Sequence, residues 1–193
     1  MKNYQRQYPL FSACGLNCGL CPRYHTDGTS RCPGCGGEGF FEKRPSCGVI
    51  TCSQRHGGIE YCYLCDEYPC KRYDRKDDVD SFISYRNVRK DFEKAKNAGL
   101  AHYQSELNEK VAILQVLLKD YNDGRRKNFY CIAVNLLELC DIKEVMAQLA
   151  KEVKPDAAVK ERVARAVQLF QEMAEKRNIT LKLNKKKAPQ KSE

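Results

Sequence analysis

Apolar residues recur at helical spacing in the second part of the chain, from about residue 79 onwards. Over residues 81–97 and again over residues 101–121 they fall at every third or fourth position, which predicts two amphipathic helices. The first is predicted to end at Gly99. The second is predicted to end at about Tyr121, because the Asn-Asp-Gly sequence that follows it is a left-handed helix-stop signal at Gly124.

Two more helices are predicted downstream. Residues 128–150 carry apolar side chains on several faces, as expected for the most buried helix. A fourth helix is predicted to begin at Pro155, which suits a first helical position, with Asp156 in the first turn. Because the connections are short, neighbouring helices should be antiparallel, and we expect an all-α helical bundle of about three to four helices over residues 79–177.

Residues 1–78 lack this periodicity and are poor in apolar side chains. In residues 1–70, Leu, Ile, Val and Phe together number only ten, whereas ten of the twelve cysteines of the chain lie there. Such a segment cannot offset its chain entropy by burying apolar surface, and below about 80 residues disulfides or metals usually supply the missing stability. We therefore expect a small, irregular, metal-stapled cysteine-rich domain over residues 1–78, ahead of the bundle.

The sequence predicts a soluble, cytoplasmic protein. No stretch approaches the run of about 18 apolar residues that spans a membrane, and the N-terminus has no apolar run typical of a secretory signal. Cytosolic thiols are kept reduced, so the cysteines indicate a metal or redox site rather than disulfides.

The cysteine spacing favours zinc. A C-x2-C pair on a tight turn can direct both sulfurs at one ion, and four sulfurs at about 2.3 Å complete a structural zinc site. Two such sites, and so about two zinc ions, would use eight cysteines: Cys18, Cys21, Cys32 and Cys35 in one, and Cys47, Cys52, Cys62 and Cys65 in the other. A crossed arrangement, in which alternate pairs share an ion, fits the same residues.

Several candidate ligands remain outside this scheme. Cys14, Cys70, His25 and His56 could complete a third site, although a lone histidine is more often a surface or packing residue. Cys131 and Cys140 lie in the predicted third helix and are expected to be small core residues.

An iron–sulfur protein is the alternative. Cys14, Cys18 and Cys21 form a C-x3-C-x2-C motif that Pro22 follows, and a later cysteine could supply the fourth ligand of a 4Fe-4S cluster. The same spacing occurs in radical S-adenosylmethionine enzymes, but no alternating β/α pattern follows it here. The sequence has no P-loop, no dinucleotide fingerprint and no Ser/His/Asp arrangement. The leading hypothesis is therefore a non-enzymatic binding or adaptor module with an unidentified protein partner.

The positive charge suggests nucleic-acid binding as a second alternative. Of the net charge of +9, residues 176–193 contribute +6, from seven basic residues and one acidic residue. The tail over residues 178–193 is predicted to be disordered and has no aromatic side chain to stack on bases. Arg125, Arg126 and Lys127, on the turn before the third predicted helix, could grip phosphate or an acidic partner.

Four motifs also carry a family resemblance: CGLNCGLCPRY at 14–24, CPGC at 32–35, CGVITC at 47–52 and EYCYLCDEYPCKRY at 60–73. In order and spacing they resemble the cysteine-rich bacterial and archaeal family known as domain of unknown function 3795, over about residues 10–75. The helical part resembles the extension of its longer members. The resemblance implies a small intracellular metal-binding domain with no established activity. The ligand positions it implies are Cys14, Cys18, Cys21, Cys32, Cys35, Cys47, Cys52, Cys62, Cys65 and Cys70.

Overall fold

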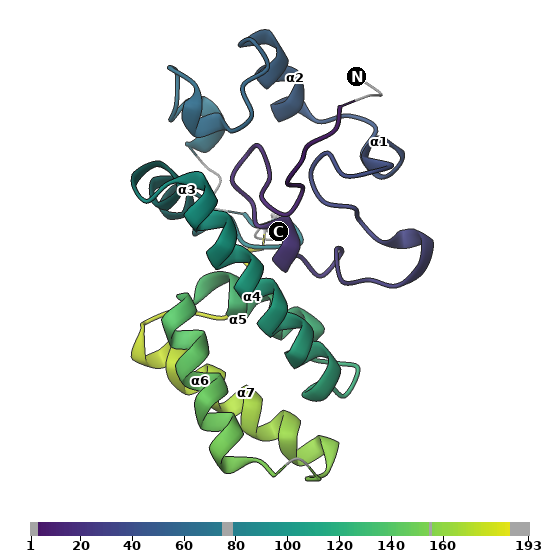
Figure 1. Cartoon of the computed structure of the whole chain (residues 1–193), viewed down its shortest axis with the longest axis vertical. Helices are drawn as coiled ribbons and strands as arrows, with labels where there is room; N and C mark the ends of the chain where they lie inside the picture. Colours follow the sequence, from purple (N-terminus) through teal and green to yellow (C-terminus); the bar gives the residue numbers. More distant parts are fainter. Residues whose placement is uncertain (1–3, 75–78, 155, 186–193) are drawn as a thin grey trace, which may run out of the picture.

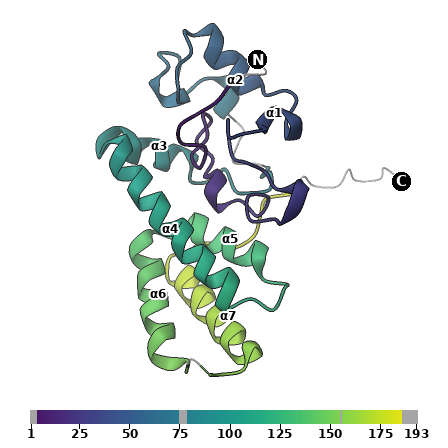
Figure 2. The ribbon, with the colours of Figure 1, turned by 45° about the vertical axis from the view of Figure 1, so that its right-hand side comes forward.

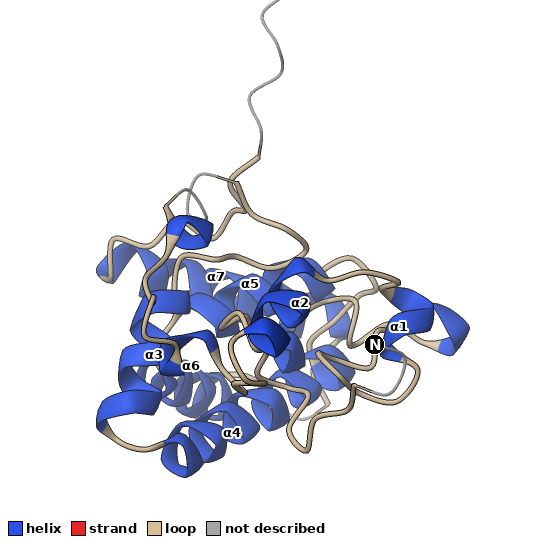
Figure 3. Cartoon of the chain, turned by 90° about the horizontal axis from the view of Figure 1, so that it is seen from above, coloured by secondary structure: helices blue, strands red, loops and turns tan. Residues whose placement is uncertain are grey.

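The computed structural model describes residues 4–74, 79–154 and 156–185. Its cysteine-rich N-terminal region consists of loops, short 3₁₀ turns and two short helices, and five longer helices follow (Figure 1). Seen from above, the described ribbon contains helices and loops but no strand (Figure 3), and an isolated bridge between Phe11 and Asn17 is its only β pairing. The bounds of the N-terminal elements are η1 Cys18–Leu20, η2 Gly28–Ser30, α1 Phe40–Lys43, α2 Gly48–Arg55, η3 Cys62–Leu64 and η4 Lys71–Tyr73.

The C-terminal part is helical, as the periodicity predicts. Its elements are α3 Val88–Asn97, α4 Leu100–Asp120, α5 Lys127–Leu136, α6 Leu139–Glu152 and α7 Val159–Lys176. The central helix α4 packs against α3, α5, α6 and the turn η1, and α6 packs against α7 (Figure 2). Within the described residues, no helix is both long enough and apolar enough to span a membrane.

The first predicted helix begins later than its apolar pattern does. Residues 81–87 form turns, and α3 starts only at Val88. The carboxylate of Asp80 explains the delay, because it accepts hydrogen bonds from Ser84 Oγ at 3.1 Å and from the Tyr85 amide at 2.9 Å. Such side-chain bonds offer the backbone an alternative to the helix.

The prediction of one continuous third helix is wrong, because the segment forms two helices, α5 and α6. Leu137 and Glu138 adopt extended conformations between them. Asn87 Nδ2 donates to the Asn135 carbonyl at 2.9 Å, and Lys110 Nζ donates to the Leu137 carbonyl at 2.8 Å. These donors satisfy carbonyl groups that lose their helical partners at the break.

The fourth predicted helix also begins later than expected. Helix α7 starts at Val159, and the Ala157 amide donates to the Lys154 carbonyl at 3.1 Å in a turn that precedes it. Asp156 is therefore not in the first turn of α7, and Pro155 lies outside the described residues.

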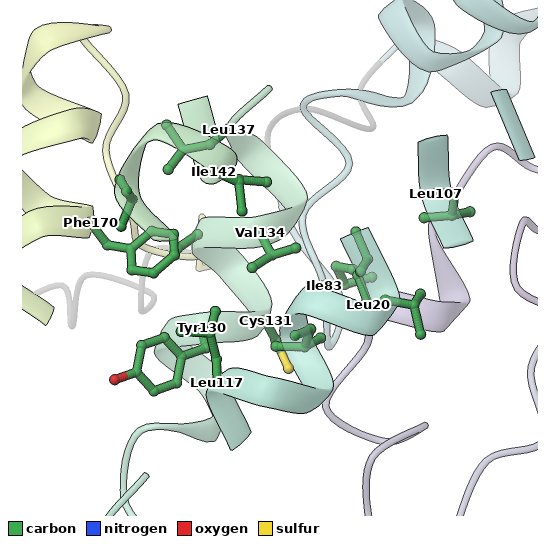
Figure 4. Close-up of a cluster of buried hydrophobic side chains, with 14 of the residues drawn as sticks. Leu20, Ile83, Leu107, Leu117, Tyr130, Cys131, Val134, Leu137, Ile142 and Phe170 are labelled. Atoms are coloured by element: carbon green, nitrogen blue, oxygen red, sulfur yellow. The ribbon is translucent and has the colours of Figure 1, made fainter. Parts of the chain in front are cut away.

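One core connects the cysteine-rich region to the helices. The ring of Phe11, which is fully buried, lies 5.2 Å from Tyr61 within its own region, 5.6 Å from Phe92 of α3 and 4.7 Å from Tyr103 of α4, measured between ring centroids. Leu20 belongs to the same cluster of buried side chains, which continues into α4, α5 and α7 (Figure 4). The cysteine-rich region therefore has a hydrophobic core, which it shares with the helical part.

Two further predictions concern the second part of the chain. Cys131 is buried in the core as expected, but Cys140, near the start of α6, is exposed. Within the basic tail, Ile179 and Leu181 pack against the core, and the Asn184 amide donates to Asp80 Oδ2 at 2.8 Å. Residues 186–193, and residues 75–78 beside the predicted domain boundary, lie outside the described residues.

Candidate metal centre

Six of the ten predicted ligands line one cavity of about 280 Å³. They come from three separate motifs of the sequence: Cys14, Cys18 and Cys21 from the first, Cys32 and Cys35 from the second, and Cys47 from the third. Arg23, Arg44 and Phe82 also line the cavity, and the described lining residues include no Asp or Glu. The fold thus gathers thiols and cations around one space.

The first cysteine loop is pressed against helix α3. Gly15, which follows Cys14, has φ of +86°, a conformation that L side chains rarely adopt. A Cβ atom at this position would lie 2.7 Å from Val88 Cγ1 and 2.8 Å from the ring of Phe92. Only glycine therefore allows the loop its close approach to α3.

Residues 9 and 10 hold the two C-x2-C turns together. The Gly19 amide of the first turn donates to the Leu10 carbonyl at 2.9 Å, and the Cys35 amide of the second donates to the Pro9 carbonyl at 2.9 Å. Gly34 has φ of +85°, and a Cβ atom there would lie 2.5 Å from the Pro9 carbonyl oxygen. The backbone thus brings together two cysteine pairs that are eleven residues apart in the sequence, from Cys21 to Cys32.

A buried polar network fixes the first cysteine loop from the helical side. Asn17, directly before Cys18, is 3% exposed. Its Nδ2 donates to Asp91 Oδ2 of α3 at 2.8 Å and to Asn135 Oδ1 of α5 at 3.2 Å, while its Oδ1 accepts from the Tyr103 hydroxyl of α4 at 2.8 Å. Three helices therefore set the position of one residue inside the C-x3-C motif.

A buried arginine lies next to Cys35. The side chain of Arg6 is 2% exposed, its guanidinium lies 4.4 Å from the Tyr61 ring centroid, and its Nη1 donates to the Phe11 carbonyl at 2.7 Å. Its carboxylate partner, Glu60, is 3.4 Å away and half exposed, and Arg6 Nε has no hydrogen-bond partner among the described residues. A buried cation with an unused donor favours negative charge nearby.

Burial favours the protonated form of three cavity thiols, those of Cys18, Cys21 and Cys35, when no cation binds them. It raises the pKa of Cys18 well above its ordinary value, and the neighbouring Cys35 raises it further. Burial also raises the pKa of Cys35, although Arg6 opposes the shift, and it raises the pKa of Cys21. A metal would therefore displace protons on binding, which makes its affinity dependent on pH.

The other four predicted ligands are not among the residues that line this cavity. They are Cys52, Cys62, Cys65 and Cys70. Cys65 Sγ lies 3.8 Å from His56 Nδ1, whereas His25 Nε2 lies 2.7 Å from the Gly19 carbonyl oxygen. None of the twelve cysteines, all of which lie in the described ranges, forms a disulfide.

The twelve cysteines suggest a metal, but the described part of the chain contains no preformed ion site. Among the described residues, no three His, Cys, Asp or Glu side chains form a group that could hold a metal ion. The polar residues that support the cavity were not predicted from the sequence either. Asp91 could have been found, because it lies three residues after Val88 on a stripe that is otherwise apolar, but Arg6 and Asn17 carry no such signal.

Comparison with known proteins gives a family match within the cysteine-rich region. Residues 10–75 match the family model described as "Protein of unknown function (DUF3795)", which confirms the resemblance of the four motifs. Searches of curated proteins and of solved structures gave no match. The family description gives no function, so a functional proposal has to rest on the cavity itself.

Proposed function

We propose that this protein is a non-enzymatic binding module that holds a metal centre with the thiolates of the cavity. Cys14, Cys18, Cys21, Cys32, Cys35 and Cys47 are the candidate ligands, and four of them would be enough for one centre. The observation that carries the proposal is the gathering of six thiols from three motifs around one space without a carboxylate.

The size of the cavity favours an iron–sulfur cluster over a single zinc ion. A tetrahedral zinc ion draws four sulfurs to about 2.3 Å, which would give a compact group of ligands and leave little space between them. The six thiols instead share the lining of a cavity of about 280 Å³ with other side chains, and among the described residues no three of them are grouped for one ion. A cluster bound there by cysteine thiolates would supply one-electron redox chemistry.

The surrounding charges also suit a thiolate-held centre. Arg6 is buried beside Cys35, and Arg23 and Arg44 line the cavity. Thiolates around a cluster carry net negative charge, which these guanidinium groups would balance. In this proposal Arg6 is a positioning and charge-balancing residue rather than a ligand.

Structural zinc is the second candidate, because both members of two C-x2-C pairs, Cys18/Cys21 and Cys32/Cys35, line the cavity. These four residues are the first of the two zinc sites that the spacing predicts. Zinc there would join the two turns and stabilise the fold without redox chemistry.

The test is the metal content of the full chain purified without oxygen. We expect iron and acid-labile sulfide in equal amounts and absorbance near about 400 nm. Zinc without sulfide would instead support the second candidate. A colourless protein with neither metal, whose cavity thiols all react with a thiol reagent, would overturn the proposal.

Matched cysteine variants locate the centre. Cys18→Ser and Cys35→Ser should lose most of the bound metal, because both side chains line the cavity. Cys140→Ser is the control, since this thiol is exposed at the start of α6 and should not affect metal content. Equal metal content in all three variants would place the centre elsewhere.

A further inference from the structure

A second cavity, of about 460 Å³, lies between the loop that follows Cys21 and the turn that precedes α5. Tyr24, His25 and Arg31 line it from the loop, and Lys119 and Lys127 line it from the helical part. Its volume is within the range of about 300–1,000 Å³ that is usual for small-molecule sites. We propose that this cavity binds a small phosphate-bearing molecule, a function separate from that of the metal centre.

The lining carries an excess of positive charge. Arg31, Lys119 and Lys127 are cations, whereas Asp27 is the only carboxylate among the described lining residues. None of these three cations takes part in an ion pair between described residues. Uncompensated cations around a concave surface attract anions. Three cations and one carboxylate leave a net charge of +2, which matches the two negative charges of a phosphate monoester.

Local contacts hold two of the cations in place. The guanidinium of Arg31 lies 4.9 Å from the centroid of the Tyr24 ring, and Lys127 Nζ donates to Thr26 Oγ1 at 3.3 Å. Arginine presents a planar set of donors that suits phosphate oxygens. Lys127 is also the first residue of α5, and the positive end of a helix dipole favours an anion there.

The electrostatic environment of His25 supports a phosphate site in this cavity. Burial lowers the pKa of His25, and the charges of Arg31 and Lys127 lower it further. Two cations therefore act on the same face of the cavity, where an anion would relieve their repulsion.

The basic turn before α5 allows binding of a small ligand to be distinguished from binding of a nucleic acid. Arg125 and Arg126 precede Lys127 and are exposed, but neither lines the cavity. A polymeric phosphate backbone that tracks the basic turn would use all three side chains. A small phosphate compound in the cavity would use Lys127 alone among them.

Calorimetric titration of the full chain with pyrophosphate tests the proposal. Lys127→Gln and Arg31→Gln should each weaken binding about tenfold, the loss of one charge-assisted hydrogen bond. Arg126→Gln is the matched control, because it removes the same charge from the same turn outside the cavity, and it should change affinity less than about twofold.

Two results would overturn the proposal: no binding of pyrophosphate by the unmodified chain, or equal losses for Lys127→Gln and Arg126→Gln. Equal losses, with tighter binding of single-stranded DNA than of pyrophosphate, would favour a nucleic-acid surface on the turn. The metal content of the same samples is measured separately, so a failure here leaves the proposal for the metal centre unaffected.

Discussion

Asn17 shows how a single side chain ties the cysteine motif to the rest of the molecule. Both of its Nδ2 bonds and its Oδ1 bond go to buried partners that lie 74, 118 and 86 residues away in the sequence. A polar side chain with all its partners supplied by distant helices specifies one arrangement of the loop. No pattern along the chain indicates such partners, which is why this residue could not be predicted from the sequence.

Replacing Asn17 should therefore destabilise the protein strongly. Asn17→Ala removes three buried hydrogen bonds, to Asp91, Asn135 and Tyr103, which should lower the free energy of unfolding by about 3 kcal/mol. Asn108→Ala is the control, because Asn108 is exposed and its bond to the Tyr8 hydroxyl is accessible to water. Urea denaturation of both variants measures the difference, and similar midpoints would contradict the role of the network.

Asp91 should make the stability dependent on pH. Burial raises its pKa from 3.8 to about 6 against the opposing effects of Lys110, Asn17, Tyr103 and Lys94. Because the folded pKa lies above the unfolded one, the native state binds the proton more tightly. The contribution of this group is therefore present below about pH 4 and is lost as the pH rises through about 6.

The Asp91→Asn variant removes this dependence. Relative to this variant, the unmodified chain should lose about 3 kcal/mol of unfolding free energy between about pH 4 and pH 7. This loss corresponds to the difference of about two pKa units between folded and unfolded Asp91. Urea midpoints at several pH values measure the loss. Glu93→Gln, an exposed change on the same helix, should leave the pH profile unchanged. Parallel profiles for Asp91→Asn and the unmodified chain would contradict the prediction.

At the level of elements, the apolar pattern predicted where helices occur better than where they end. Helix α4 runs from Leu100 to Asp120, close to the predicted 101–121. The break between α5 and α6 was missed because Leu136, Leu137 and Leu139 continue the apolar pattern across it. The carbonyls at the break are satisfied by side chains from α4 and from the residue before α3, and such tertiary contacts leave no mark on the local periodicity.

The contact between the first cysteine loop and α3 can be tested with two glycines. Gly15 and Gly57 both have positive φ, of +86° and +80°, but a Cβ atom would meet α3 at Gly15 and nothing within 4 Å at Gly57. Backbone strain alone should cost about 1 kcal/mol at either position, and overpacking should add about 1–3 kcal/mol at Gly15. Gly15→Ala should thus be the more destabilising in thermal unfolding, and equal losses would mean that the loop does not press on α3.

For the whole molecule, the shared core changes what the proposed metal is expected to contribute to stability. The composition of residues 1–70 predicts that a metal must hold this region because it cannot build a core of its own. In the structure, Phe11, Leu20 and Tyr61 complete a core with α3 and α4 instead. Removing the proposed metal should therefore loosen the cysteine loops while the helices and their contacts with this region persist.

A single shared core also predicts that both parts unfold together. Leu149 is fully buried in α6, far along the chain from every candidate ligand, and Leu149→Ala should cost about 2–5 kcal/mol. In chelator-treated protein, unfolding by urea is monitored with two signals. Circular dichroism reports on the helices, and the reactivity of the cysteine thiols reports on the cysteine-rich region. If residues of both parts form one cooperative unit, Leu149→Ala should lower the midpoints of both signals equally.

Val116→Ala serves as the control, because Val116 is 42% exposed on α4 and its truncation should shift neither midpoint by much. One result would contradict the prediction of a single cooperative unit. If Leu149→Ala lowered the midpoint for the helices but left that for the thiols unchanged, the cysteine-rich region would fold by itself. Residues 1–78 and 79–177 would then be separate domains, as their compositions suggest, and the contacts of Phe11 with α3 and α4 would join two units that are stable alone.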